Sequence, residues 1–318
     1  MESSNMNNKV SKLDLLREAV ESVYVGERRT TDLLLCALLA RGHVLIEDLP
    51  GVGKTTLVSA LAKSTALTFA RIQFTPDVLP SDITGFSIFD PKTGELTYSR
   101  GAVLNNIVLA DEINRASPKT QSALLEVMQE NQVTVDGRSY CAPDPFMVLA
   151  TQNPIEFAGT YPLPEAQLDR FLLCLTLGYP SLEDEKNILT RFERDRSYAS
   201  LSPIYDAGDI VSLQETADDI IVSDEVREYV VSITRQTRRD SDIMLAASPR
   251  ASLALLRAAK AKALLSGREY VIPDDVKELA EPVLAHRLTL SSEARLNNLT
   301  PKEILRRVLR SVAVPGAK

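Results

Sequence analysis

The chain has 318 residues, of which 44% are hydrophobic and 25% are charged, a composition typical of a soluble protein with two packed units. Its 36 basic and 43 acidic residues leave a net charge of −7, which argues against a basic nucleic-acid-binding module. No apolar run approaches the roughly 20 residues that span a bilayer. The start, MESSNMNNKV, lacks a hydrophobic signal region. Neither export nor membrane insertion is therefore predicted.

The cysteines and histidines are few and scattered. Cys36, Cys141 and Cys174 are odd in number, widely spaced and in apolar surroundings, which predicts buried free thiols in a reducing compartment and so a cytoplasmic protein. His43 and His286 have no cysteine or carboxylate at metal-ligand spacing. We therefore expect structural roles for both histidines rather than a zinc site.

The first half of the chain alternates helical and strand signals. Residues 1–11 are polar and predicted to be disordered, after which apolar residues at helical spacing predict an amphipathic helix and then a second helix over residues 28–41. Short apolar strands follow, with helical stretches between most of them, which predicts a mostly parallel sheet covered by helices. The predicted strands are residues 44–46, 70–74, 107–110, 146–151 and 171–175.

Two segments interrupt this alternation. Residues 86–98 contain two strand-like stretches around a proline- and glycine-containing turn. Residues 132–141 contain two more around a strong Asp136-Gly137 turn signal. Both segments are predicted to be β-hairpins.

The strand signals stop at Gly178-Tyr179-Pro180, and the rest of the chain is predicted to be helical. One helix start is well marked, because Ser248 supplies a capping hydroxyl before Pro249. The expected fold is an α/β core over residues 12–179, with a parallel sheet covered by helices, followed by a smaller all-helical domain over residues 180–318. The predicted helices of that domain cover residues 181–195, 207–217, 224–238, 249–265, 273–287 and 301–312.

The string HVLIEDLPGVGKTT at residues 43–56 predicts a strand, a glycine-containing loop and a helix start, the context that a phosphate-binding loop requires. Gly51 and Gly53 let backbone N–H groups turn toward phosphates at the positive end of the helix. Lys54 is expected to reach the β and γ oxygens of ATP, and Thr55 to give its hydroxyl to Mg²⁺. The pattern expects glycine where Asp48 stands, so the loop must make its first turn without it. The candidate binding residues are Pro50, Gly51, Val52, Gly53, Lys54, Thr55 and Thr56.

The apolar strand at residues 106–110 ends in two acids, Asp111 and Glu112. Both carboxylates should emerge at the carboxyl edge of the sheet beside the phosphate loop, where α/β sheets bind ligands. Asp111 is suited to hold Mg²⁺ through its water shell. Glu112 can accept a proton from the water that attacks the γ-phosphate, which predicts hydrolysis rather than binding alone.

Three further residues are candidates for catalysis. Asn153 follows the strand at residues 146–151 and could orient the attacking water, although Gln152-Asn153-Pro154 fits a simple turn equally well. Arg170 and Arg250 are the best candidates to neutralise charge on the transferring phosphoryl group. Taken alone, each arginine would more often form a salt bridge.

Several strings together resemble the MoxR family of AAA+ ATPases, in its helix-2-insert branch. They are VGE at residues 25–27, DEINRA at 111–116, ATQNP at 150–154, LPEAQLDRF at 163–171 and SPR at 248–250. The DEINRA and LPEAQLDRF strings are far more specific than the Gly-Lys-Thr of the phosphate loop. The match spans nearly the whole chain.

The resemblance implies a role for each catalytic candidate. Asn153 corresponds to sensor 1, Arg170 to the finger inserted into the neighbouring subunit's site, and Arg250 to sensor 2 on a helical lid. Val25 and Gly26 would lie beside the adenine. An oligomer therefore follows from the resemblance, since Arg170 would act on the next subunit.

The resemblance also implies the kind of assembly and its task. Residues from about 85 to 101 would form the helix-2 insert and those from about 131 to 142 the pre-sensor-1 hairpin, both projecting toward the pore of a ring, usually a hexamer. The family resembles a chaperone-like machine that matures or remodels client protein complexes, often inserting metal centres. Its usual partner is a von Willebrand factor A (VWA) domain protein.

The same motifs also fit three other functions. The motor subunit of a metal chelatase shares both inserts, but the DEINRA string favours the MoxR branch. A DNA translocase would need basic hairpin tips. Each hairpin has only one arginine, Arg100 in the first and Arg138 in the second, which argues against this function. A nucleotide-dependent switch that hardly turns over is a further alternative, because Arg170 acts only across a subunit interface.

Overall fold

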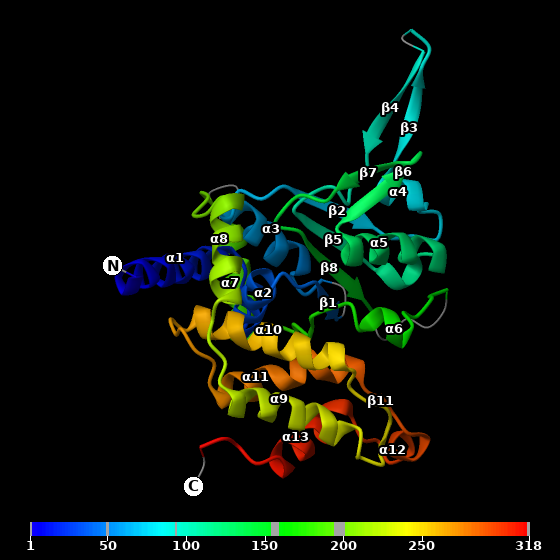
Figure 1. Ribbon diagram of the computed structural model, residues 1–318. Helices are drawn as coiled ribbons and strands as arrows, with labels where there is room; N and C mark the ends of the chain where they lie inside the picture. Colours follow the sequence, from blue (N-terminus) through cyan, green and yellow to red (C-terminus); the bar gives the residue numbers. More distant parts are fainter. Residues whose placement is uncertain (1, 49–50, 93, 154–158, 194–200, 317–318) are drawn as a thin grey trace.

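A computed structural model describes residues 2–48, 51–92, 94–153, 159–193 and 201–316 of the chain. It contains an α/β core and a helical lid packed beneath it, and a long hairpin projects from the core on the side away from the lid (Figure 1). The expected architecture of an α/β core with a helical lid is confirmed. The exact boundary near residue 179 stays a prediction.

Five parallel strands form the sheet of the core, in the order β2-β5-β8-β1-β9. Leu149 of β8 is in register with Val44 of β1 on one side and with Leu109 of β5 on the other. The carboxyl end of β8 therefore lies between the ends of the strands that precede the phosphate loop and the acid pair. The strands are β1 (Val44–Glu47), β2 (Phe69–Gln73), β5 (Ile107–Asp111), β8 (Met147–Gln152) and β9 (Leu173–Leu175).

Helices cover both faces of this sheet, because successive side chains of a strand point to opposite faces. Val44 and Ile46 belong to one hydrophobic cluster, and Leu45 between them belongs to the other. The helices on the first face are α1 (Glu2–Val23), α2 (Arg28–Leu39) and α3 (Lys54–Ser64), and those associated with the second are α4 (Pro80–Thr84) and α5 (Pro118–Glu130). Two short turns, η1 (Ile113–Arg115) and α6 (Glu165–Leu168), lie in the connections.

Helix α1 begins at Glu2, so residues 2–11, which the sequence predicts to be disordered, are helical instead. The buried side chains of Leu13, Leu16 and Val20 fix the later turns of this helix against the core. Once those turns are formed, each added residue contributes a hydrogen bond without a new nucleation step, which explains why the helix continues into the polar segment.

Both predicted hairpins are confirmed. Tyr98 of the first hairpin stacks on Tyr140 of the second, with ring centroids 3.9 Å apart and planes at 17°. The two hairpins are therefore joined at this point, and the rest of the first one projects beyond it (Figure 1). The strands are β3 (Gly85–Asp90) with β4 (Glu95–Arg100), and β6 (Gln132–Val135) with β7 (Arg138–Cys141).

The lid contains every helix that the sequence predicts, together with the short α12 that it does not. The expectation that strands stop at Gly178 is wrong, because β10 (Ile243–Leu245) and β11 (Thr289–Leu290) form an antiparallel pair. Segments this short show no local alternation of apolar residues, and they pair only because the lid brings them together. The helices are α7 (Leu182–Glu193), α8 (Ala207–Asp218), α9 (Asp224–Thr237), α10 (Pro249–Leu265), α11 (Pro273–Leu284), η3 (Ala285–Arg287), α12 (Ser292–Leu296) and α13 (Pro301–Ser311).

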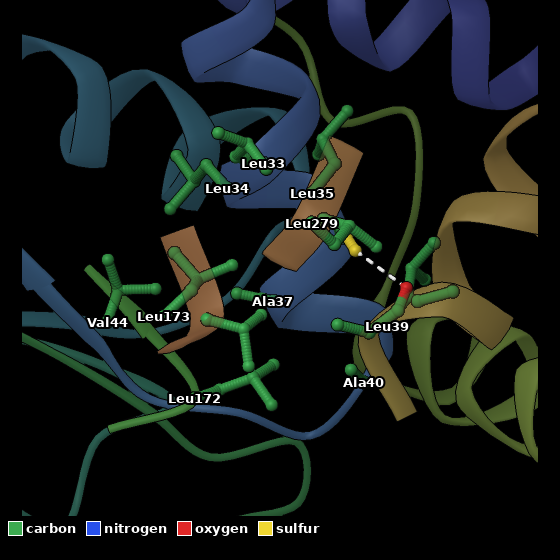
Figure 2. Packing of buried hydrophobic residues seen from close by; sticks show 14 of the residues in the cluster. Leu33, Leu34, Leu35, Ala37, Leu39, Ala40, Val44, Leu172, Leu173 and Leu279 are labelled. Carbon is green, nitrogen blue, oxygen red and sulfur yellow. Dashed lines mark hydrogen bonds between the residues drawn. The ribbon is translucent and has the colours of Figure 1, made fainter. Parts of the chain in front are cut away.

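Helix α2 joins the core to the lid. Its apolar side chains are buried between β9 of the sheet and the lid helices α8 and α10, and the Cys36 thiol donates to the carbonyl oxygen of Ala258 in α10 at 3.1 Å (Figure 2). Burial raises the pKa of Cys36 to about 12. The expectation of buried thiols is wrong for Cys141, which is exposed, and only partly met by the half-buried Cys174. Cys141 ends the hairpin β6–β7, and its strand neighbour Tyr140 takes the inward position, packed on the core and on Tyr98.

No helix in the described part of the chain combines the length and apolar character needed to cross a bilayer.

His43 is a buried structural residue, as expected. Its Nε2 donates to the carbonyl oxygen of Met128, and its Nδ1 accepts from the backbone N–H of Val148, each at 3.0 Å. A ring nitrogen that accepts an N–H bond cannot carry a proton, so the fold selects neutral imidazole. Burial is the main cause that lowers the pKa of His43 to about 4.

We expect the free energy of unfolding to fall as the pH drops from about 6.5 toward about 4, because the unfolded chain takes up a proton at His43 before the folded chain does. Above about pH 6.5 His43 is neutral in both the folded and the unfolded chain, so its full contribution to the free energy of unfolding is present. The total loss at His43 is about 3 kcal/mol. In His43→Gln, which keeps a donor and an acceptor but cannot titrate, the melting temperature should depend less on pH between about 7 and 5. An unchanged pH dependence would contradict this account.

Candidate nucleotide-binding site

The phosphate loop connects β1 to α3 at the carboxyl edge of the sheet, so the expected strand-loop-helix context is present. Gly51 and Gly53 have backbone φ angles of +88° and +87°, a conformation that glycine adopts without steric cost. Lys54 and Thr55 begin α3, where free backbone N–H groups and the positive end of the helix dipole favour anions. Pro50, a candidate binding residue, lies outside the described residues.

A hollow of about 430 Å³ lies beside this loop. Three segments line it: residues 23–27, residues 51–53 with Thr56, and residues 177–181 with α7. The candidates Val25, Gly26, Val52 and Thr56 are thus brought together with the glycines of the loop. The hollow therefore adjoins the glycines of the phosphate loop.

Tyr24 makes the packing at one end of this hollow tight. A Cβ atom on Gly26 would lie 2.4 Å from the Tyr24 hydroxyl, and one on Gly53 would lie 3.5 Å from the Tyr24 ring. Burial, followed by the charges of Asp48 and Glu27, raises the pKa of Tyr24 to about 12, so its hydroxyl stays protonated. Glycine is therefore required at position 26 by close packing.

Asp48 occupies the loop position where glycine is usual, and the structure gives it a specific role. Its side chain is buried, and one carboxylate oxygen accepts from the backbone N–H groups of Leu177 at 2.5 Å and Gly178 at 2.8 Å. Its carbonyl oxygen accepts from Lys54 Nζ at 3.2 Å. The loop thus begins on a residue that binds both Lys54, the candidate phosphate-binding lysine, and the connection to the lid.

Asp111 ends β5 and is buried, and each of its two carboxylate oxygens accepts a hydrogen bond from a different side chain. Thr151 Oγ1 donates to Oδ1 at 2.7 Å, and Arg71 Nη2 donates to Oδ2 at 2.6 Å. Arg71 lies on the neighbouring strand β2, and its side chain is 46% exposed. The charge of Asp111 is therefore balanced by a cationic group that can move into solvent.

Glu112 follows in a left-handed backbone conformation, with φ +58° and ψ +47°. Such a conformation is uncommon for a residue other than glycine, and it is typical of strained functional positions. The backbone N–H of Glu112 donates to Thr151 Oγ1 at 2.9 Å. Its carboxylate accepts from Gln73 Nε2 at 3.0 Å and pairs with Arg115 Nε at 3.1 Å. These three contacts hold Glu112 in one orientation.

Asn153 directly follows β8, between the acid pair at the end of β5 and the loop at the end of β1. This is the position that the sequence predicts for an amide between the two motifs. Neighbouring strands are roughly 5 Å apart, so the loop strand and the acid strand are separated by about 10 Å with β8 between them.

Replacing Thr151 by valine should lower the turnover number by about tenfold or more, because a buried donor to Asp111 and a buried acceptor for Glu112 are lost together. Thr151→Ser keeps the hydroxyl and should retain nearly the wild-type rate. Steady-state phosphate release at saturating ATP distinguishes the two variants. Equal rates in both would show that the hydroxyl does not position the acids.

Arg170 and Arg250 lie together on the opposite side of the sheet. Both line a second hollow, of about 730 Å³, whose other walls include residues 42–43 before β1 and residues 128–132 at the end of α5. None of the described loop residues lines it. The two arginines therefore line one hollow at the amino edge of the sheet, away from the phosphate loop of their own chain.

The Asp169 carboxylate joins the segment that carries Arg170 to the segment of the lid that carries Arg250. Arg287 Nε donates to Asp169 Oδ1 at 2.7 Å, and the hydroxyl of Ser248, the N-cap of α10, donates to Oδ2 at 3.0 Å. Burial lowers the pKa of Arg287, and the hydrogen bond and charge of Asp169 counter that effect. Arg170 follows Asp169 and Arg250 follows Ser248 by two residues, so one carboxylate ties the segments that carry both.

A parallel sheet that runs into a phosphate loop, with an acid pair two strands away and a helical lid, defines a P-loop ATPase of the AAA+ class. The profile of the ATPase family associated with various cellular activities (AAA) matches residues 43–173, and that of the AAA lid domain matches residues 235–308. The enzyme class expected from the sequence is confirmed.

Comparison with known proteins narrows this class. The chain is 52% identical to the uncharacterized protein YeaC of Bacillus subtilis, over 95% of each chain, and 45% identical to the chaperone MoxR1 of Mycobacterium tuberculosis, over 93% of this chain and 80% of that one. A crystal structure of a candidate ATPase from Cytophaga hutchinsonii is 38% identical, with a TM-score of 0.92 over 98% of this chain and 97% of that one. A magnesium-chelatase subunit ChlI homolog of Methanocaldococcus jannaschii is 27% identical over 58% of this chain and 50% of that protein. The chain belongs to the MoxR family of AAA+ ATPases.

Sequence reasoning missed several residues of the site. Arg71 and Gln73 lie about 40 residues before the acid pair and reach it only because β2 pairs with β5. Thr151 belongs to the ATQNP string, but only the position of β8 beside β5 shows that its hydroxyl serves both acids. Tyr24 precedes the noted Val25 and Gly26, and its aromatic side chain beside them was the available signal.

Proposed function

We propose that ATP binds with its phosphates on the loop and its base in the adjoining hollow, beside Val25 and Gly26, and that the chain hydrolyses it with Mg²⁺. A Cβ atom built on Gly51 meets no atom within 4 Å, so the backbone at this point of the loop is accessible. Lys54 would bind the β and γ oxygens, and Thr55 would ligate the metal ion. This assignment is supported by the loop geometry and by membership of the family.

The acid pair fits a hydrated divalent cation. Asp111 already binds a positive group, because Arg71 occupies one of its oxygens, and the exposed guanidinium of Arg71 can leave. Mg²⁺, when bound, would neutralise charge on the phosphate oxygens. Thr55 and Asp111 are the residues that would hold it.

Glu112 is proposed as the general base. Its carboxylate is held by Gln73 and Arg115, and it would take a proton from a water molecule that Asn153 orients. Thr151 keeps the backbone of Glu112 and the side chain of Asp111 at a fixed spacing. In this arrangement Asn153 orients the attacking water and Glu112 accepts its proton, so the water needs no further activation.

We further propose that the chain forms a ring, a hexamer as is usual in the family, in which Arg170 and Arg250 complete the site of the next subunit. The observation that carries this proposal is the separation of the two hollows: the arginines and the phosphate loop of one chain lie at opposite edges of the sheet. A cationic side chain placed at the transferring phosphoryl group can accelerate hydrolysis strongly. The site of an isolated chain is therefore incomplete.

The task proposed for this motor is chaperone-like remodelling or maturation of client protein complexes. The projecting hairpin β3–β4 supports this, because Phe86, Ile88, Phe89 and Leu96 are between 47% and 59% exposed. A group of exposed large apolar side chains on one projecting element is typical of a protein-binding surface. By family membership we also propose a VWA-domain partner, client complexes with metal centres, and a cytoplasmic location.

A nucleotide-dependent capture experiment tests this function. Tagged Glu112→Gln chain, which should hold ATP without splitting it, is used as bait and compared with Lys54→Ala, which should not bind ATP. The VWA-domain partner and the client should be recovered with the first bait only when ATP is present. Recovery of the same proteins with both baits, or of none, would contradict ATP-driven remodelling.

The motor subunit of a metal chelatase is the second candidate, because chelatase subunits are among the more distant relatives. Their identities of 27% and 23% are well below the 45% shared with the chaperone MoxR1. The same capture experiment separates the two candidates. Tetrapyrrole-binding subunits on the Glu112→Gln bait would favour the chelatase.

A further inference from the structure

Helix α7 closes one side of the nucleotide hollow, and its attachment to the core begins at Asp48. The Asp48 carboxylate accepts two backbone N–H bonds, from Leu177 and Gly178, where the chain leaves the core for the lid. The residue is only 6% exposed, so water competes little for these bonds. Hydrogen bonds to a carboxylate are stronger than those between neutral groups.

The attached connection leads directly into α7. Ser181 and Asp184 cap the start of the helix, with Asp184 N–H donating to Ser181 Oγ at 3.1 Å and Ser181 Oγ donating to the Asp184 carboxylate at 2.6 Å. Toward the far end, Arg191 donates to the carbonyl oxygens of Glu21 and Ser22 at 3.1 and 2.8 Å. Helix α7 thus spans from the phosphate loop to the end of α1, next to the segment that carries Val25 and Gly26.

The apolar side chains of α7 that the structure describes add little to this attachment. Leu182 and Leu189 are 71% and 65% exposed, and Ile188 is 42% exposed. An element that buries little apolar surface is held mainly by its polar contacts and opens at low free-energy cost. The position of α7 over the hollow therefore depends on the bonds at its two ends.

We propose that Asp48 is a positioning residue for nucleotide retention: by fastening the Leu177-Gly178 connection to the phosphate loop, it keeps α7 over the hollow and slows nucleotide release. The proposal rests on the nucleotide site proposed above and adds a residue and a step to it. It also accounts for an acid where phosphate loops usually have glycine.

A simple charge argument predicts the opposite effect. A carboxylate close to bound phosphates repels them, so its removal should strengthen nucleotide binding. Replacement by glycine also restores the usual phosphate-loop pattern. If Asp48 instead fastens α7, the same replacement should weaken retention, and the sign of the change decides between the two accounts.

The experiment measures release of fluorescent N-methylanthraniloyl-ADP, with Mg²⁺, from the full chain by stopped flow. Asp48→Gly should release it about tenfold faster, because two hydrogen bonds to a buried carboxylate are lost. Asp48→Asn keeps one oxygen that can accept these bonds and should lie between wild type and Asp48→Gly. Hydrogen exchange at the amides of Leu177 and Gly178 should accelerate in the same order.

Asp206→Asn is the matched control, because the Asp206 carboxylate accepts a backbone N–H in the lid, from Asp209 at 2.8 Å, but does not line the hollow. It should leave the release rate unchanged. Equal or slower release from Asp48→Gly, or unchanged exchange at both amides in Asp48→Gly, would overturn the proposal. Failure of the wild-type chain to bind the probe at all would instead overturn the proposed nucleotide site.

Discussion

Replacing Glu112 by glutamine should reduce steady-state ATP hydrolysis by about 100-fold or more while ATP still binds. Glutamine has the same shape, and its carbonyl oxygen can accept the bonds that Gln73 and Arg115 donate to Glu112, so the left-handed turn is preserved. Its amide cannot accept the proton that the attacking water must lose. Phosphate release at saturating ATP measures the loss, and calorimetry with a non-hydrolysable ATP analogue measures binding.

The control for this prediction is Glu228→Gln. Glu228 is an exposed acid of α9, outside the described nucleotide hollow, so the same chemical change there should leave the rate unchanged. A Glu112→Gln chain that hydrolyses ATP at the wild-type rate would exclude Glu112 as the base. Loss of binding together with loss of turnover would show instead that the residue serves to build the site.

Replacing Arg170 by alanine should lower the turnover number by a factor of about 1,000, with nucleotide affinity nearly unchanged. The side chain belongs to the hollow at the opposite edge of the sheet, so its loss should leave the phosphate loop of its own chain intact. Mixing this variant with Lys54→Ala should restore turnover. In mixed rings an intact loop from the Arg170→Ala chain faces an intact arginine from the Lys54→Ala chain.

Arg227→Ala is the control and should keep the wild-type turnover number, since Arg227 forms only an exposed ion pair with Asp224 in the lid. Turnover per wild-type chain should also rise with protein concentration, because an isolated chain lacks a neighbour's arginines. A rate independent of concentration down to the monomer, or mixtures that stay inactive, would contradict completion of the site by a second subunit.

Local sequence signals account for the parts of the site that follow one another along the chain. The loop with Gly51, Gly53 and Lys54 is recognised from spacing because each residue acts through its own backbone or a short reach. Asp111 and Glu112 are recognised because an apolar strand delivers them to the sheet edge. The hairpin with Asp136-Gly137 is recognised because two adjacent residues determine its turn.

Contacts between distant segments could not be read in this way. Arg71 neutralises Asp111 only because β2 is the neighbour of β5, and Thr151 serves both acids only because β8 is the other neighbour. Strand order depends on how the whole sheet packs, not on any one strand. The pair β10–β11 and the helical start of α1 likewise follow from the packing of other elements.

The phosphate loop, the acid pair and the helical character of the lid were determined by the sequence itself, because they depend on residue type at short spacing. The tertiary structure alone decided that Asp48 binds Leu177 and Gly178, and that Arg170 and Arg250 share a hollow remote from their own loop. These relations join segments far apart along the chain. Burial of α2 between the sheet and the lid fixes where the lid sits, and with it which residues meet.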